Sequence, residues 1–335
     1  MTDIKKLRKK IFSKAISNER FSEIALEIFS YQYHNCSVYH QYVDMIGVDP
    51  AAVKTIYEIP FLPIQLFKSN KIITSEQERE PEIVFSSSST TGMTPSKHFV
   101  LDTSMYLESV TLAFERFYGD PAEYIYLALL PSYLEREGSS LVYMMEWLIS
   151  LSKSKESGFY LYDQEDMYYA LRQFQDEGRK TILIGVTFAL LDFAEKFQLL
   201  DSFPELIVIE TGGMKGRGEE LPREIVHDKI KKAFNINRVG SEYGMAELLS
   251  QAYSYEGGIF QSPAWMKILI RDFNNPFQYL PNNTQGAINI IDLANIHSCS
   301  FIETEDRGTK LSPNAFVVQG RISDSERRGC NMLIE

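Results

Sequence analysis

Residues 83–97 read IVFSSSSTTGMTPSK, an apolar run followed by serines and threonines, then one glycine, one proline and one lysine. The apolar run is typical of a buried strand, and the polar residues after it indicate a loop. Hydroxyl and backbone N–H groups on such a loop bind phosphate oxygens, and a lysine adds positive charge. The stretch therefore predicts a phosphate-binding loop, although it lacks the GxxxxGK[ST] spacing of a Walker loop. The alternative is a flexible Ser/Thr-rich linker, which rarely joins a strand to an apolar segment within a domain.

The composition excludes several classes of protein. The chain has 335 residues, enough for one large domain or two ordinary ones, and a net charge of −11, which disfavours a nucleic-acid partner. It has no apolar run of about 18 residues, so we expect no membrane span. The chain has three cysteines, Cys36, Cys299 and Cys330. This small, odd number favours a reducing compartment such as the cytoplasm over a disulfide framework. No cysteine or histidine spacing indicates a metal site.

The hydrophobic pattern predicts the fold class. Residues 4–46 are helical in pattern, and after residue 97 apolar runs of strand length alternate with helical patterns. The expected strands are 124–130, 181–186 and 206–209, and the expected helices are 103–117, 139–150, 188–197 and 221–234. From residue 265 on, only strand patterns occur, at 266–270, 287–291 and 315–318. This order predicts an α/β fold, with helices around a mostly parallel sheet and a β-rich C-terminal part.

We expect the chain to be organised in three parts. They are a helical part at residues 1–80, an α/β part at 81–315, and a hinge-like C-terminal tail at 316–335 that contains Cys330.

Two motifs follow apolar runs, at the strand ends where open α/β sheets bind ligands. Gly212 and Gly213 form a pair that lets a flat ring or a phosphate approach the backbone, or else a simple glycine-rich turn. Tyr243 precedes Gly244, and Glu247 follows three residues later. An aromatic ring stacks on a purine and a carboxylate holds Mg²⁺ near phosphates, but a turn before a helix gives the same pattern.

Taken in order, these motifs resemble those of adenylate-forming enzymes. Their phosphate loop is Ser/Thr-Ser-Gly-Thr-Thr-Gly-x-Pro-Lys, and the matching residues here are Ser88, Thr90, Thr91, Gly92, Pro95 and Lys97. Ser89 replaces the glycine of that loop. The Gly212–Gly213 pair resembles the element that contacts adenine.

Further resemblances follow along the chain. Tyr243, Gly244 and Glu247 match the Tyr-Gly-x-Thr-Glu motif, but Ala246 replaces the threonine, so a hydroxyl contact to the α-phosphate is expected to be missing. Asp306 resembles the aspartate of Thr-Gly-Asp, which holds the ribose hydroxyls. Arg321 matches the Gly-Arg-x-x-Asp hinge and would reach the phosphate or the ribose.

Within this superfamily, the chain resembles the acyl-protein synthetases of the bacterial luminescence fatty-acid reductase. These also stop just past the hinge, without the usual small C-terminal domain, and Cys330 occupies the place of their acyl-accepting cysteine. The resemblance implies that ATP and Mg²⁺ activate a carboxylic acid, expected to be a fatty acid. Glu247, Lys97 and Cys330 would be catalytic, with Glu247 as the metal ligand. The acyl group would be loaded on Cys330 as a thioester and passed to a partner protein, an acyl-CoA-type reductase or an acyl carrier.

Two other functions remain open at this point. One is an acid–CoA ligase of the phenylacetate type. The other is a nucleotide-binding partner subunit without catalysis, which Ala246 and the missing C-terminal lysine favour.

Overall fold

The chain begins with helices, as its pattern predicts. The computed structural model describes residues 3–74, 79–87, 94–130, 138–160, 163–212 and 221–322. The first helices are α1 (Ile4–Ile11), α2 (Asn18–Asn35) and α3 (Ser37–Met45), which confirms the helical pattern of residues 4–46. Asp3 and Ser17 begin α1 and α2, because each side chain accepts a hydrogen bond from a backbone N–H of the first turn.

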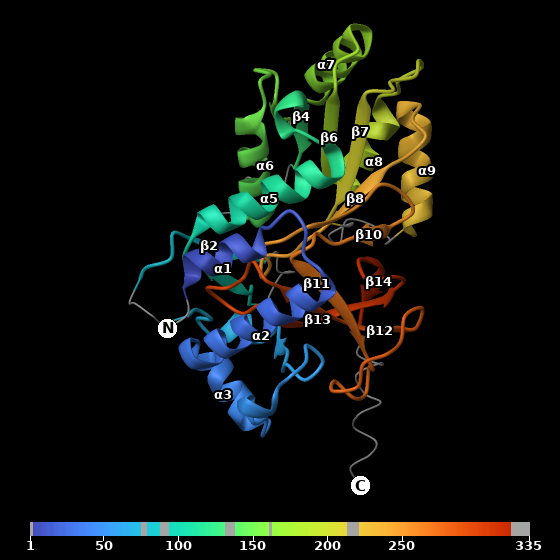
Figure 1. Ribbon diagram of the computed structural model, residues 1–335. Helices are drawn as coiled ribbons and strands as arrows, with labels where there is room; N and C mark the ends of the chain where they lie inside the picture. The colour runs from blue at the N-terminus through green and yellow to red at the C-terminus, as the bar shows by residue number, and fades with distance from the viewer. Residues whose placement is uncertain are drawn as a thin grey trace.

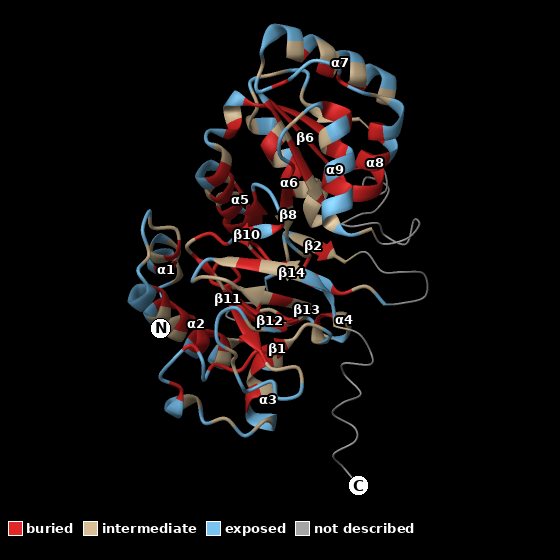
Figure 2. Ribbon diagram, turned by 90° about the vertical axis from the view of Figure 1, so that its right-hand side faces the viewer, coloured by how far each residue is buried: buried red, intermediate tan, exposed pale blue. Residues whose placement is uncertain are grey.

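Parallel strands form one half of the large sheet (Figure 1). In spatial order they are β8 (Gly240–Tyr243), β7 (Leu206–Thr211), β6 (Thr181–Val186), β4 (Ile125–Leu129) and β5 (Gly158–Phe159). Every residue of β4 and β6 is buried, because helices cover both faces of this half. Figure 2 shows α5 and α6 on one side and α8 and α9 on the other. These helices and α7 are α5 (Thr103–Tyr118), α6 (Ser140–Leu151), α7 (Gln164–Glu177), α8 (Thr187–Lys196) and α9 (Arg223–Phe234).

Antiparallel strands continue the same sheet beyond β8. In spatial order they are β9 (Ala252–Ser254), β10 (Ile259–Gln261), β14 (Ala315–Arg321), β13 (Phe301–Lys310), β12 (Gln285–Asp292) and β11 (Met266–Arg271). The strands predicted at 266–270, 287–291 and 315–318 are therefore confirmed. The fold is α/β with a β-rich C-terminal part, as the sequence predicts.

The N-terminal helices pack on this antiparallel half. The rings of Phe29 in α2 and Phe301 in β13 meet edge to face, with 6.3 Å between their centroids. Gln32 in α2 is fully buried, and its Nε2 donates to the carbonyl of Asn295 at 2.9 Å. Residues far apart in the sequence thus share one core.

Short elements border the large sheet. The strands β2 (Ile83–Ser86) and β3 (Lys97–Val100) pair in a separate antiparallel sheet, which confirms the strand predicted before the polar loop. The strand β1 (Leu62–Pro63) runs parallel to β13 and leads into helix α4 (Leu66–Ser69). Single turns of 3-10 helix lie at Pro50–Ala52 and Pro121–Glu123.

The predicted division into three parts stays a prediction. In the structure, β1 from the first part pairs with β13, and the boundary at residue 316 falls within β14. Among the helices of the described ranges, none is both long and apolar enough to cross a bilayer.

Candidate active site

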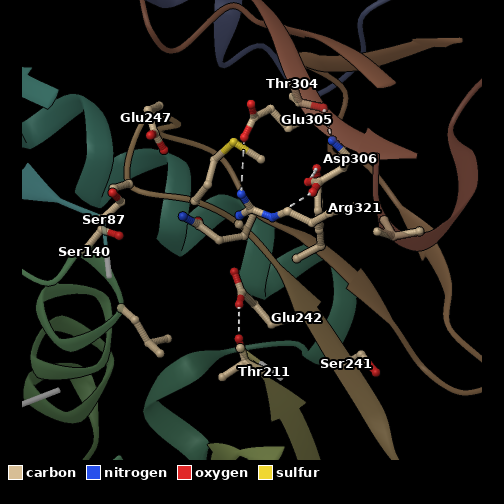
Figure 3. A pocket seen from close by; sticks show the side chains of 18 of the residues that line it. Ser87, Ser140, Thr211, Ser241, Glu242, Glu247, Thr304, Glu305, Asp306 and Arg321 are labelled. Atoms are coloured by element: carbon tan, nitrogen blue, oxygen red, sulfur yellow. Dashed lines mark hydrogen bonds and ion pairs between the residues drawn. The ribbon is translucent and has the colours of Figure 1, made fainter. Parts of the chain in front are cut away.

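A cavity of about 1100 Å³ opens where the parallel and antiparallel halves of the sheet meet (Figure 3). The ends of β7 and β8, the end of β2, the residues just before β3, the start of α6 and the strands β13 and β14 all contribute to its walls. Ser86 N donates to the carbonyl of Gly138 at 2.8 Å, which joins β2 to the residues just before α6. The predicted site residues that line the cavity are Gly212, Tyr243, Gly244, Glu247, Asp306 and Arg321.

Part of the predicted site lies outside the described residues. These predicted residues are Ser88, Thr90, Thr91, Gly92, Gly213 and Cys330. On either side of the polar loop, however, Ser87 and Ser96 line the cavity, so both ends of the loop lie at its wall.

Tyr243, Asp306 and Arg321 form one cluster at the antiparallel side of the cavity. The Tyr243 hydroxyl donates to Asp306 Oδ2 at 2.8 Å, and Arg321 Nε lies 3.6 Å from Asp306 Oδ1. Burial raises the pKa of Asp306, although the Arg321 guanidinium opposes this shift. The backbone N–H of Asp306 donates to Thr304 Oγ1 at 3.1 Å, which orients the strand at this point. A carboxylate with a fixed orientation is suited to accept hydrogen bonds from a diol such as ribose.

The Tyr243 ring packs among aromatic side chains of β10 and β14. Its centroid lies 5.7 Å from that of Phe260 and 5.6 Å from that of Phe316. These contacts hold the ring beside the cavity, where a planar base would meet an aromatic surface.

Glu247 lies at the wall of the cavity next to the β2–β3 pair. It is only 5% exposed and accepts a hydrogen bond from the Ser96 hydroxyl. Burial raises the pKa of Glu247, which Ser96 and Arg321 oppose. The carbonyl of the preceding residue, Ala246, lies 2.9 Å from Nδ1 of the buried His98. Ala246 and Glu247 therefore contact β3 and the residue just before it.

The structure does not bring Lys97 into the cavity. Side chains alternate along β3, so Ser96 and His98 are buried while Lys97 between them is exposed. Lys97 is not among the described residues that line the cavity, whereas Lys68 of α4 is. The phosphate contact of Lys97 therefore stays a prediction, and its side chain lies outside the described wall of the cavity. The sequence pattern around α4 is too short to predict where Lys68 lies. Lys68 reaches the cavity because β1, just before α4, pairs with β13.

Acidic residues that the sequence analysis missed line the other end of the cavity. Glu210 and Glu242 stand on the neighbouring parallel strands β7 and β8, and Thr211 Oγ1 donates to Glu242 Oε2 at 2.6 Å (Figure 3). Burial raises the pKa of Glu242 to about 7, and the nearby Glu210 carboxylate adds to this shift. The position of both residues at strand ends is the signal that could have identified them.

Comparisons with known proteins agree with this architecture. A family model described as "Acyl-protein synthetase, LuxE" matches residues 9–114. No curated protein matches the chain.

Solved structures show where the same fold occurs. An open conformation of 2-hydroxyisobutyryl-CoA ligase, in complex with 2-HIB-AMP and CoA, superimposes with a TM-score of 0.66 at 12% identity, covering 94% of this chain and 77% of that chain. ATP-bound MatB from Rhodopseudomonas palustris gives a TM-score of 0.54 at 15% identity, with coverages of 74% and 50%. The chain thus aligns with about half the length of MatB, and at these identities the likeness concerns the fold alone. The resemblance to acyl-protein synthetases is confirmed over residues 9–114, and the chain has the α/β fold of the adenylate-forming enzymes.

Proposed function

We propose that this chain activates a carboxylic acid with ATP, loads the acyl group on Cys330 and passes it to a partner protein. The observation that carries the proposal is the meeting of Tyr243, Asp306, Arg321 and Glu247 in one cavity. These residues come from three motifs, one with Tyr243 and Glu247, one with Asp306 and one with Arg321, and the fold brings the three motifs together. The acid would be a fatty acid by resemblance to the acyl-protein synthetases of the luminescence reductase.

The proposed reaction has two steps. A carboxylate oxygen attacks the α-phosphorus of ATP, the bond to the β-phosphate oxygen breaks, and pyrophosphate leaves. The Cys330 thiolate then attacks the acyl carbon of the adenylate, a C–S bond forms, and AMP leaves with the electrons of the broken C–O bond. The acyl group would next move by the same exchange to an acceptor on an acyl-CoA-type reductase or an acyl carrier.

Each residue of the cavity has a separate task in the first step. Asp306 would accept hydrogen bonds from the ribose, oriented by Tyr243, while Arg321 would lie near the ribose or the phosphates. Glu247 would hold Mg²⁺, since one carboxylate together with substrate phosphates is a common ligand set for this ion. Its burial and its hydrogen bond from Ser96 fit a fixed ligand. The ion would offset the negative charge of the phosphates.

The described cysteines support Cys330 as the acceptor by their environment. Cys36 and Cys299 are fully buried, and burial raises the pKa of both thiols, so neither offers an accessible thiolate. The family model covers residues 9–114 only, so the assignment of Cys330 rests on the resemblance of its position and on this contrast.

Acid-dependent exchange of pyrophosphate into ATP tests the first step. We expect exchange with the parent protein and a decrease of at least about 10-fold in Glu247→Gln, because this change removes a charge and keeps the shape. Glu224→Gln, on the surface turn that begins α9, is the matched control. If Glu247→Gln exchanges at the parent rate, Glu247 has no part in adenylate formation.

An acid–CoA ligase is the second candidate, favoured by the structural likeness to 2-hydroxyisobutyryl-CoA ligase. It predicts acyl-CoA as a product when CoA is added, at the same rate in the parent and in Cys330→Ser. The acyl-protein synthetase hypothesis predicts that Cys330→Ser forms no acyl thioester on the protein.

A further inference from the structure

The end of the cavity next to β7 and β8 is built from polar side chains of distant segments. Tyr106 comes from α5, Ser140 from α6, and Gln251 from the residues before β9, where they join Thr211 and Glu242. Figure 3 shows Ser140 on the wall across from Glu242 and Thr211, and Asp306 at the other end of the cavity. This polar end, defined by these five residues, is therefore separate from the Tyr243–Asp306–Arg321 cluster.

Hydrogen bonds join the residues of the polar end. The Tyr106 hydroxyl donates to the Ser140 carbonyl at 3.0 Å and accepts from Gln251 Nε2 at 3.4 Å. Thr211 Oγ1 donates to Glu242 Oε2 at 2.6 Å. The Tyr106 hydroxyl has a single hydrogen, which it gives to the Ser140 carbonyl, so toward Gln251 it can only accept. The Gln251 amide is therefore oriented with Nε2 toward Tyr106 and Oε1 away from it.

The polar end also contains a buried acceptor atom, Gln251 Oε1, that receives no hydrogen bond from the described residues. Gln251 is only 4% exposed, and its Oε1 is buried without a hydrogen-bond partner among the residues that the structure describes. A Cβ atom on Gly244 would lie 2.5 Å from Glu242 Oε1 and 3.5 Å from Gln251 Cγ, so both side chains border the same point. A buried acceptor without a partner is unfavourable, and in native proteins it is usually satisfied by water or a ligand.

The charge state of Glu242 fits this arrangement. Its pKa is raised to about 7 by burial, with a further contribution from Glu210, so a substantial fraction is ionised at neutral pH. An ionised carboxyl group only accepts hydrogen bonds. Leu141 and Met144 of α6 also line the cavity and supply apolar surface for a carbon chain.

We propose that the polar end binds the acyl part of the substrate, and that this substrate is a carboxylic acid carrying a hydroxyl or amino group. That group donates hydrogen bonds to Gln251 Oε1 and Glu242 Oε1, while the carbon chain lies along Leu141 and Met144. An unsubstituted alkyl acid would cover both acceptors without giving them a partner. The inference rests on the proposed acid activation, because it assigns the acid to the same cavity.

Matched acids test it on the parent protein. The probes are hexanoate and decanoate, each with its 2-hydroxy, 3-hydroxy and 3-amino counterparts. Two readouts are taken for each acid: kcat/KM from pyrophosphate exchange into ATP, and the shift in Tm of the protein with the acid alone. We expect at least one substituted acid to exceed its unsubstituted counterpart by about 10-fold or more in kcat/KM, because a site built around a substrate donor rejects the analogue that lacks it.

Variants show whether the preference comes from the polar end. Gln251→Leu removes the free acceptor at similar volume and should bring the ratio between the two acids close to one. Gln251→Met is a second, more flexible replacement in case leucine perturbs folding. Gln173→Leu makes the same exchange at an exposed position of α7 and should keep the parent ratio.

The outcomes separate this inference from the proposed function. Unsubstituted acids that match or exceed their counterparts in both readouts overturn the inference while acid activation stands, as does an unchanged preference in both Gln251 variants. A substituted acid that raises the Tm of the parent but of neither Gln251 variant, without exchange by any acid, supports binding of that acid at the polar end and overturns the proposed function. Neither exchange nor a Tm shift with any acid overturns both.

Discussion

Asp306 is the residue on which nucleotide binding is expected to depend most. Its carboxylate receives the Tyr243 hydroxyl at 2.8 Å and lies near Arg321, while its backbone is held by Thr304. The sequence resemblance predicts its contact with ribose, but not the tyrosine that orients it. Tyr243 was expected to stack on the base, and the structure adds this second contact through its hydroxyl.

Replacing Asp306 by alanine should weaken ATP binding by about 1–3 kcal/mol, the cost of leaving hydrogen-bond donors unpaired. Isothermal titration calorimetry measures the change directly. Asp228→Ala on the exposed face of α9, where the side chain pairs with Lys231, is the control that should bind ATP as the parent does. Unchanged affinity in Asp306→Ala would remove this residue from the nucleotide site.

Lys68 rather than Lys97 should supply positive charge to the cavity. Lys68 lines it and is partly buried, whereas Lys97 is exposed on the other face of β3. Lys68→Ala should lower the rate of pyrophosphate exchange by about 10-fold or more, because a lost contact to a charged group costs about 1.5–3 kcal/mol. Lys97→Ala, the matched control, should change it little. The reverse order of effects would return the phosphate contact to Lys97.

At the scale of elements, the length of an apolar run determines how much of a strand the sequence predicts. The apolar runs at 181–186 and 206–209 become the buried strands β6 and β7, because their pattern is continuous and helices cover both faces. The four-residue strand β3 carries no such run. Whether Lys97 or its neighbours face the cavity depends on the pairing of β3 with β2, which is a tertiary contact.

His98 links β3 to the segment that carries Glu247 and should make stability depend on pH. Burial lowers its pKa to about 4, whereas the unfolded chain would have the ordinary value of about 6.5. The unfolded state thus binds more protons below pH 6.5, so this contribution is complete above pH 6.5 and decreases as pH falls toward 4. Between pH 7 and pH 5, His98 should account for a loss of about 2 kcal/mol, at 1.36 kcal/mol per pKa unit.

Urea unfolding of the parent and of His98→Gln at both pH values isolates this contribution. Glutamine keeps a donor for the Ala246 carbonyl but does not titrate. The parent should lose more stability than the variant when the pH is lowered. Equal losses in both proteins would show that His98 does not determine the pH dependence.

At the scale of the whole molecule, the cavity exists because two kinds of sheet meet. The parallel half brings Gly212 and Glu242 to its carboxyl edge, and the antiparallel half brings Asp306 and Arg321 to the same place. The sequence predicts the order of these parts but not their registers, since β9, β10 and β14 are placed by long-range pairing. For the same reason Gln251, which belongs to no motif, could not be predicted from the sequence, whereas the position of Glu242 near the end of β8 is a signal that the sequence offers.

Transfer of the acyl group to Cys330 tests the whole proposal most directly. The protein is incubated with ATP, Mg²⁺ and radiolabelled acids, from decanoate to its hydroxy counterparts, and label on the protein is measured before and after neutral hydroxylamine, which cleaves thioesters. We predict hydroxylamine-sensitive label on the parent. Cys330→Ser should carry none and still form acyl-adenylate, since activation and transfer use different residues; Cys36→Ser should be labelled like the parent. Equal labelling of Cys330→Ser and the parent would contradict the proposal.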